Sequence, residues 1–303
     1  MVVKKIEEDF IMSPKIDFAF KLLFGDERNK NLLISFLSAI LNVSKEELRD
    51  VKVINSELFR DYKEDRKGIL DVRAETKDKK QIDIEIQINP IDYMDKRTVY
   101  YWAKMYASQL KSGETFDELK KCITVNIVDF KCTDIKKLHT VYHITEDEVH
   151  NRLTEMLEIH FLELSKLFDK DVIINENDPV VEWMRFLNAK TREVMKMLGD
   201  KNKDIEEALR ILEVMSKDEK ARMEYEAREA ALKDERTRLK SAEEKGREEG
   251  REEGREEGRE EGREEGRKEE RIVVAKKLIR LGLDIKDIME ATGLTEAEIN
   301  ELL

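Results

Sequence analysis

The chain has 303 residues, of which 42% are charged, and its formal net charge is −12 at pH 7. This charge argues against broad, nonspecific adhesion to nucleic acid because like-charged surfaces repel, although it is compatible with a local basic groove. Two cysteines without CxxC spacing, a charged N-terminus and no apolar run near ~20 residues argue against a disulfide scaffold, a signal peptide and a membrane span. We therefore expect a soluble, cytoplasmic protein.

The charge is unevenly distributed along the chain. Residues 1–130 carry 23 basic and 24 acidic side chains, whereas residues 131–303 carry 34 and 45. The sequence therefore predicts a near-neutral globular part followed by an acidic extension.

The first predicted elements are two helices. In residues 12–24, Ser13 and Pro14 precede an apolar-periodic stretch, which is typical of a helix start. Residues 31–41 are apolar almost all round, so we expect that helix to be buried.

Three strand-like segments follow at residues 51–60, 68–76 and 81–89. The third alternates strictly, with isoleucines on one face and polar side chains on the other, and Pro90 ends it. The polar connector 77–80 predicts that the second and third segments form a hairpin.

An aromatic-rich amphipathic helix is predicted within residues 92–111, and a buried strand at 122–130. Strands followed by a helix and another strand indicate an α/β domain with a mixed sheet. Residues 141–144 and 157–164 are candidates for edge strands, although the second segment could also be helical.

The C-terminal part is predicted to be helical from Pro179 onward. The sequence divides into an α/β domain at 1–200, a charged helix at 201–245, a repeat of five Gly-Arg-Glu-Glu units within 246–270, and a helical module at 271–303. We interpret the repeat as a spacer with helical tendency, although its glycine stripe could also allow self-association.

The module at 271–303 superficially resembles a helix–turn–helix. Its second helix, however, carries Glu296, Glu298 and Glu301 and no basic residue, so it would repel phosphates. An oligomerisation or partner-docking role is favoured over a DNA-binding regulator.

Carboxylates occupy one face of the predicted hairpin. Asp71 shares a face with Arg73 and Glu75 on one strand, and Asp83, Glu85 and Gln87 share a face on the next. If the strands pair, Asp71 can lie across from Glu85 and Gln87. Two close carboxylates repel unless a cation or proton separates them, and Mg²⁺ prefers such oxygen ligands.

Simpler interpretations compete with a metal site. Taken alone, a polar strand face is more often a solvated edge. The four histidines within 139–160 suggest zinc, but their strand-like spacing favours structural roles. Basic side chains flanking the hairpin could contact phosphates, with surface solvation as the default for each one: Lys67, Arg73, Lys96 and Arg97.

The Asp71…Glu85-Ile86-Gln87 arrangement resembles the PD-(D/E)XK nuclease superfamily. Across roughly residues 12–200 the chain is similar to the Rpn family of recombination-promoting nucleases and transposases. The strings that carry this resemblance occur in the family's order: SPKIDFAFKLLFG (13–25), KGILDVRAET (67–76), IDIEIQ (82–87), YYWAKMYASQLKSGE (100–114) and EIHFLELSKL (158–167).

The resemblance implies a restriction-endonuclease-like α/β core, with a mixed sheet flanked by helices and followed by a long helical extension. It also implies DNA cleavage that depends on Mg²⁺ or Mn²⁺. Asp71 and Glu85 would be metal ligands, Asp17 a further acidic ligand, and Gln87 would stand at the superfamily's lysine position. Leu70 replaces the proline of the motif name.

The leading hypothesis is therefore a metal-dependent DNA endonuclease linked to recombination or transposition. Gln87 would position the attacking water, and the C-terminal helices would form a homo-oligomer. The alternative is a nuclease-fold protein with weak or no catalysis that acts as an interaction module.

Overall fold

A computed structural model describes residues 10–54 and 71–303. Contacts between residues divide the chain into two compact units, one ending at Glu235 and the other comprising Arg236–Leu303. The regular elements are, in chain order, α1 (Asp17–Phe24), η1 (Glu27–Asn29), α2 (Lys30–Leu41), β1 (Lys52–Ile54), β2 (Val72–Glu75), β3 (Gln81–Gln87), α3 (Met94–Ala107), η2 (Phe116–Glu118), β4 (Cys122–Val128), β5 (His139–Tyr142), β6 (Leu157–Glu163), η3 (Leu164–Phe168), α4 (Pro179–Leu187), α5 (Arg192–Gly199), α6 (Lys203–Lys217), α7 (Glu219–Arg280), α8 (Ile285–Thr292) and α9 (Glu296–Asn300).

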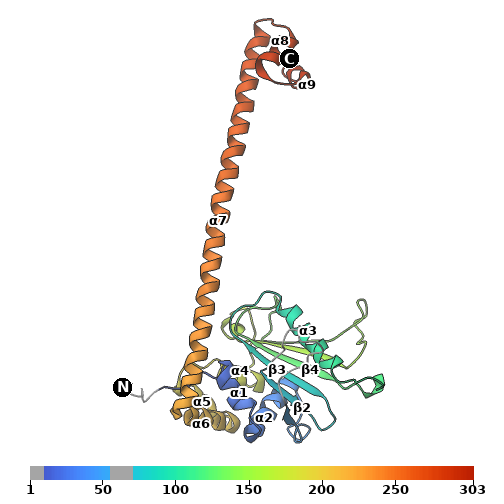
Figure 1. Ribbon diagram of the computed structural model, residues 1–303, viewed down its shortest axis with the longest axis vertical. Coiled ribbons are helices and arrows are strands. Elements are labelled where there is room, and N and C mark those ends of the chain that lie inside the picture. Colours follow the sequence, from blue (N-terminus) through green and yellow to red (C-terminus); the bar gives the residue numbers. More distant parts are fainter. Residues whose placement is uncertain (1–9, 55–70) are drawn as a thin grey trace. The chain divides into compact units, whose positions relative to one another are not determined.

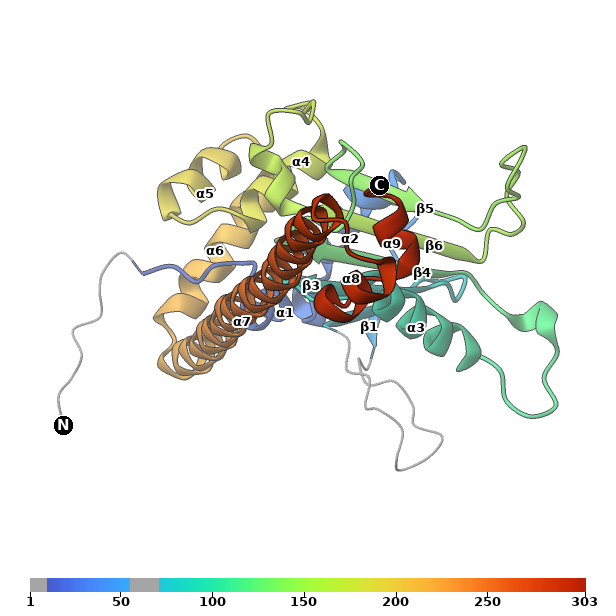
Figure 2. The same ribbon diagram turned by 90° about the horizontal axis from the view of Figure 1, so that it is seen from above.

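The first unit contains a mixed six-stranded sheet in the order β1-β2-β3-β4-β6-β5 (Figures 1 and 2). The pair β2–β3 is antiparallel, which confirms the predicted hairpin. Strands β3, β4 and β6 are parallel. Helix α3 provides the crossover that two adjacent parallel strands, β3 and β4, require.

Two strand predictions change in the structure. The segment at 157–163 is an inner strand, β6, rather than an edge strand or a helix, because it pairs with β4 on one side and β5 on the other. The expected strand at 51–60 is described only as β1, since residues 55–60 lie outside the described part, as do residues 68–70 before β2.

One face of the sheet forms the main hydrophobic core with α1, α2, α4 and α6. The inward isoleucines of β3, including Ile82 and Ile84, are fully buried there. Aromatic rings fill the helical layer, with the Phe24 ring 4.7 Å from Phe36 and 5.6 Å from Trp183. The expected burial of α2 is confirmed, whereas α1 begins at Asp17, after the Ser13–Pro14 turn.

Helix α3 covers the opposite face, over β3 and β4 (Figure 1). The polar side of β3 is therefore buried as well: Asp83 is 1% exposed and Glu85 is 5% exposed. The alternation of the sequence correctly predicts the two faces of this strand. It does not show that a second helix layer removes the polar face from water.

The first compact unit extends past the expected boundary at residue 200. Helix α6 buries Ile205, Ala208 and Leu212 in the main core, and Tyr225 of α7 is buried against Phe10. The division therefore falls at 235/236 because α6 and the first turns of α7 pack on the α/β domain.

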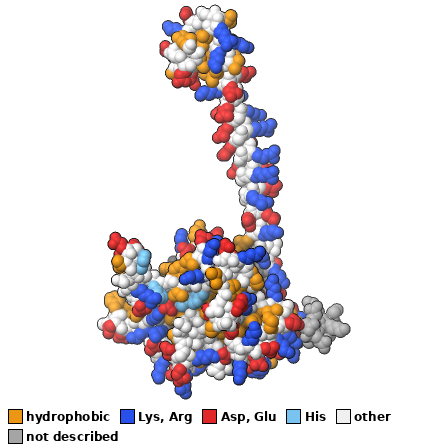
Figure 3. Space-filling view, turned by 180° about the vertical axis from the view of Figure 1, so that it is seen from behind, with side chains coloured by type: hydrophobic (Ala, Val, Ile, Leu, Met, Phe, Trp, Pro, Cys, Tyr) orange, Lys and Arg blue, Asp and Glu red, His pale blue; other side chains and the backbone are white. Residues whose placement is uncertain are grey.

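The second unit contains the Gly-Arg-Glu-Glu repeat as part of α7, and Figure 3 shows acidic and basic side chains along this helix. Beyond the neighbouring backbone of the helix itself, no described atom lies within 4 Å of a Cβ that could be added at its glycines, such as Gly254. Residues Ala275, Ile288, Leu294 and Ile299 form a small core between the end of α7, α8 and α9. In the described part of the chain, no helix is both long and apolar enough for a bilayer.

Candidate active site

Asp71 lies immediately before β2, at the entrance to the hairpin. The β2–β3 register pairs Val72 with Ile84, so one further step sets Asp71 opposite Glu85. The Oδ2 atom of Asp71 accepts a hydrogen bond from the backbone N–H of Ile86 at 2.9 Å. This bond fixes the carboxylate beside β3, as the hairpin prediction requires.

Glu85 and Asp83 project from the same face of β3 and lie under α3. The Oε2 atom of Glu85 is 3.4 Å from Nη2 of Arg97, whereas its buried Oε1 has no hydrogen-bond partner among the described residues. Both carboxylate oxygens of Asp83 also lack such a partner. Buried carboxylate oxygens without a hydrogen-bond partner are costly, so this group of side chains is a candidate ligand site.

Burial raises the pKa of Asp83 well above its ordinary value, and the neighbouring Glu85 and Asp71 carboxylates raise it further. Burial is also the main cause of the raised pKa of Glu85, which Arg97 and Lys21 partly oppose. A bound cation would reverse these effects because it favours the charged form of each carboxylate.

Cationic side chains surround the carboxylates. Lys21 of α1 places Nζ 2.9 Å from Oδ1 of Asp71. Arg97 pairs with Glu85 and lies 5.0 Å from the ring of Tyr101. Of the basic residues considered from the sequence, Arg73 is buried and donates to Gln81, so it cannot reach a phosphate, and Lys67 lies outside the described residues.

Gln87 ends β3 on the same face as Glu85. Its Nε2 atom donates to the backbone oxygen of Asn89 at 2.9 Å, which leaves Oε1 to accept a hydrogen bond from water. The buried side chain of Asn89 in turn donates to the backbone oxygen of Leu232 at 3.2 Å and to Glu235 at 2.8 Å. The end of β3 is therefore tied to α7.

Asp17 is also tied to α7 and stands apart from a ligand set. Its Oδ2 atom is 3.4 Å from Nε of Arg228. It lies one turn before Lys21 on α1. The proposed role of Asp17 as a metal ligand therefore stays a prediction, while the structure gives it a partner in α7.

The donor set fits a hard divalent cation of the Mg²⁺ type. Such ions bind through one or two carboxylates and keep several waters, and here Asp71 and the unpaired Oε1 of Glu85 supply oxygen ligands. Within residues 10–54 and 71–303 there is no group of three or more His, Cys, Asp or Glu side chains suited to holding a metal ion. A site formed by the chain alone would thus rely on two carboxylates and on substrate and water oxygens.

His139 and His160 lie on the face of the sheet opposite these carboxylates. The Nε2 atom of His139 is 2.8 Å from Nδ1 of His160, whose Nε2 atom is 2.8 Å from Glu158. Burial and the neighbouring His160 lower the pKa of His139 to about 4, so its ring is neutral at pH 7. This hydrogen-bonded chain is a structural arrangement of the kind expected from the strand-like spacing.

Lys21 and Asn89 are site residues that the sequence reasoning missed. Lys21 belongs to an amphipathic helix whose pattern is explained by packing alone, and only the tertiary fold brings its ammonium group to Asp71. Asn89 appears in the sequence as one more polar position of the alternating strand. Its contact partner is 143 residues further along the chain, beyond the reach of local pattern.

The mixed sheet, its covering helices and the Asp71–Glu85 pair define an α/β fold of the nuclease-like kind with an Asp…Glu-x-Gln site. The model of the PD-(D/E)XK nuclease family transposases matches residues 14–242, and the chain belongs to that family. No curated protein matched the chain. No solved structure matched it either.

Proposed function

We propose that this protein is a metal-dependent DNA endonuclease that acts in recombination or transposition. The observation that carries the proposal is the pairing of Asp71 with Glu85 across the hairpin, beside buried carboxylate oxygens that lack partners. Membership of a nuclease family of transposases supports the same reaction class. The oligomeric state and the cytoplasmic location stay predictions.

The chain's own residues divide the work of phosphodiester hydrolysis. Asp71 and Glu85 would hold Mg²⁺ or Mn²⁺, which supplies positive charge that polarises the phosphodiester and acidifies water. Gln87 accepts a hydrogen bond from the attacking water through Oε1 and so orients it. Because glutamine carries no charge, the ammonium group of Lys21 supplies the cationic group beside the scissile phosphate.

The test is cleavage of supercoiled plasmid by purified protein in Mg²⁺, Mn²⁺, Ca²⁺ or EDTA. Glu85→Gln, which preserves shape and removes charge, is compared with Glu75→Gln, a partly buried carboxylate on β2 that pairs with Lys79. We expect Mg²⁺- or Mn²⁺-dependent nicking by the wild type and by Glu75→Gln. Because Glu85→Gln loses a proposed metal ligand, its nicking rate should be about a thousandfold lower than that of the wild type.

Cleavage that survives Glu85→Gln unchanged would overturn the site. Absence of cleavage by the wild type in every metal, together with a thermal midpoint indifferent to Mg²⁺, would favour the interaction-module alternative. The fold would stand in either case.

A further inference from the structure

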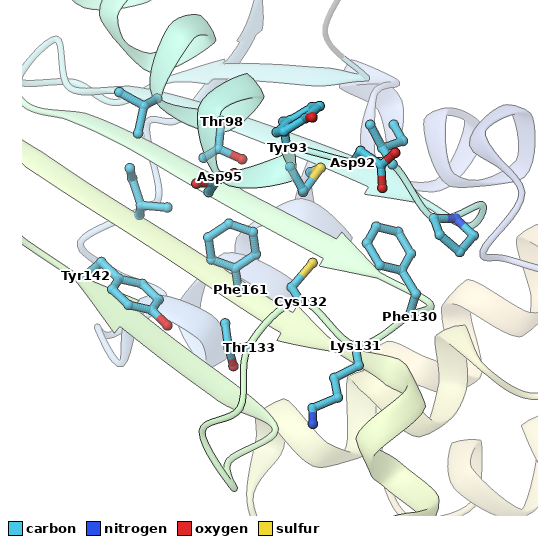
Figure 4. Close-up of a pocket in the computed structure, with 15 residues that line it drawn as sticks. Asp92, Tyr93, Asp95, Thr98, Phe130, Lys131, Cys132, Thr133, Tyr142 and Phe161 are labelled. Carbon is cyan, nitrogen blue, oxygen red and sulfur yellow. The ribbon is translucent and has the colours of Figure 1, made fainter. Parts of the chain in front are cut away.

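A cavity of about 570 Å³ opens on the face of the sheet that α3 covers (Figure 4). It lies where the loops leave the carboxyl ends of β3 and β4, the position at which open α/β sheets commonly bind ligands. Its volume falls within the range of about 300–1,000 Å³ typical of small-ligand pockets. The walls are mainly apolar and include four aromatic side chains, Tyr93, Phe130, Tyr142 and Phe161.

The register of the sheet places the cavity and the proposed cleavage site on the same face. Glu85 of β3 pairs with Asn126 of β4, and Asn126 pairs with Phe161 of β6, so the three side chains form a row on one face. Two strand spacings separate Glu85 from Phe161, which is about 10 Å. Thr98 lines the cavity and donates to Asn126 at 3.0 Å, next to Arg97, which pairs with Glu85.

One wall of the cavity is fixed in place before any ligand arrives. Glu163 and Lys166, 0% and 4% exposed, form a buried ion pair at 2.6 Å. Glu163 also accepts hydrogen bonds from the backbone N–H groups of Cys132 and Thr133 at 2.8 and 3.3 Å. A wall held this firmly reduces the entropy that binding would otherwise lose.

Tyr93 stands at the rim in an unusual conformation. Its φ of 64° lies in the left-handed region, which a bulky residue adopts only where the surroundings impose it. The side chain is 69% exposed, with Nζ of Lys96 4.5 Å from the ring centroid. A large exposed ring next to a cation suits an occupant with a flat face and a neighbouring phosphate.

The charged side chains at the cavity favour some planar ligands over others. Asp92 and Asp95 line it and repel phosphate, but their carboxylates accept hydrogen bonds from amino groups. Lys131 is paired with Asp134 at 2.8 Å and points away from the cavity in Figure 4. A planar base that lies between the aromatic rings, donates from an exocyclic amino group to these carboxylates and keeps its phosphate outside the cavity fits both the rings and the charges.

We propose that this cavity binds an unstacked nucleobase that carries an exocyclic amino group, contributed by the DNA strand held at Asp71 and Glu85. The proposal rests on the proposed nuclease function and names its substrate contact. Stacking on aromatic side chains and hydrogen bonds to the base edge are the means by which proteins hold an unstacked base.

The test measures DNA binding without cleavage, in Ca²⁺, on the full-length protein. The probes are single-stranded 12-mers of adenine, cytosine or thymine nucleotides and a 12-mer of abasic nucleotides with the same phosphates. Tyr93→Asn removes the ring and retains a residue that tolerates the left-handed region. Tyr100→Ala, on the same helix but outside the cavity and 48% exposed, is the matched control.

We expect the wild type and Tyr100→Ala to bind the adenine 12-mer about tenfold more tightly than the abasic one, and Tyr93→Asn to lose most of that difference. Asp95→Asn should reduce the preference for adenine and cytosine over thymine. Equal affinity for abasic and intact DNA, or equal losses in Tyr93→Asn and Tyr100→Ala, would overturn the base pocket. If either of these two negative results came with metal-dependent plasmid cleavage, the nuclease function would stand and only the base pocket would be rejected.

Discussion

Three buried carboxylates on one face of the sheet fall into two sets, Glu163 alone and Asp83 with Glu85, which differ in how many of their oxygens accept hydrogen bonds. Glu163 is fully buried, and both its oxygens accept hydrogen bonds from Lys166, Thr133 and Cys132. Asp83 and Glu85 are buried to a similar degree, yet three of their four oxygens lack a partner among the described residues.

We interpret the difference as one between a structural carboxylate and carboxylates of the proposed metal site. A satisfied buried network stabilises a particular arrangement, and here it fixes the wall of the cavity. Unsatisfied buried oxygens carry a free-energy cost that evolution retains only where a ligand repays it. Removing the charge of Glu163 should therefore lower the stability of the folded protein, whereas removing that of Asp83 should raise it.

The largest effect on stability is expected for Glu163→Ala. It leaves the ammonium group of Lys166 buried and unpaired, which costs about 3–5 kcal/mol in the free energy of unfolding. Denaturant titration measures the loss, and the double variant Glu163→Met/Lys166→Leu should recover part of it. A single variant as stable as the wild type would break the distinction between the two groups.

The next effect is a pH dependence at the satisfied carboxylate Glu158. Burial opposes its ionisation, but hydrogen bonds from His160 and Lys121 outweigh burial and lower its pKa to about 2 from 4.5. Its contribution is therefore present above pH 4.5 and is lost as the pH falls from 4.5 towards 2. Because Glu158 is only partly buried, solvent screening reduces this change to about 2 kcal/mol.

Glu158→Gln should flatten the fall of the thermal midpoint across that pH window. His139, whose pKa is about 4, should still reduce stability as the pH falls from 6.5 to 4, because the unfolded chain then binds the extra proton. A variant whose curve coincides with that of the wild type below pH 4.5 would contradict the role assigned to Glu158.

A smaller effect, on the cleavage rate, is expected when the ammonium group of Lys21 is removed from the candidate site. Lys21→Met should slow single-turnover cleavage about ten- to hundredfold, because the ammonium group near Asp71 is lost while the two proposed ligands remain. Lys170→Met, an exposed lysine elsewhere, is the control. Equal rates for the two variants would exclude Lys21 from the reaction.

The smallest effect has the opposite sign. Asp83→Asn removes a buried carboxyl group whose pKa burial raises, so the folded state should no longer lose stability as the pH rises above the ordinary pKa of 3.8 and should gain about 1 kcal/mol at pH 7. Differential scanning calorimetry should show a thermal midpoint about 2–4 °C higher in EDTA. A marked destabilisation would instead show that Asp83 is a structural carboxylate like Glu163, and the comparison would then rest on Glu85 alone.

The sequence predicts those parts of this site that are encoded locally. The alternation of β3 and the polar connector before it place Asp71 opposite Glu85, because a hairpin register follows from its turn and its period. The buried strand β4 and the helix α3 between them follow equally from local pattern.

The parts that it does not predict depend on distant contacts. The inner position of β6 follows from pairing on both sides, which a short apolar run cannot reveal. The approach of Lys21 to Asp71 is set by how α1 packs on the sheet, and Asn89 meets α7 only after the whole domain has folded. Local periodicity contains no information on either contact.

The contacts of Asn89 with Leu232 and Glu235 also set a limit on protein engineering. A shortened version that stops near residue 200 would lose α6, the Arg228 partner of Asp17 and the support behind Gln87. Such a fragment would expose apolar surface at one end and leave the end of β3 without its contacts to α7. A shortened version that keeps the whole first unit therefore extends through at least Glu235.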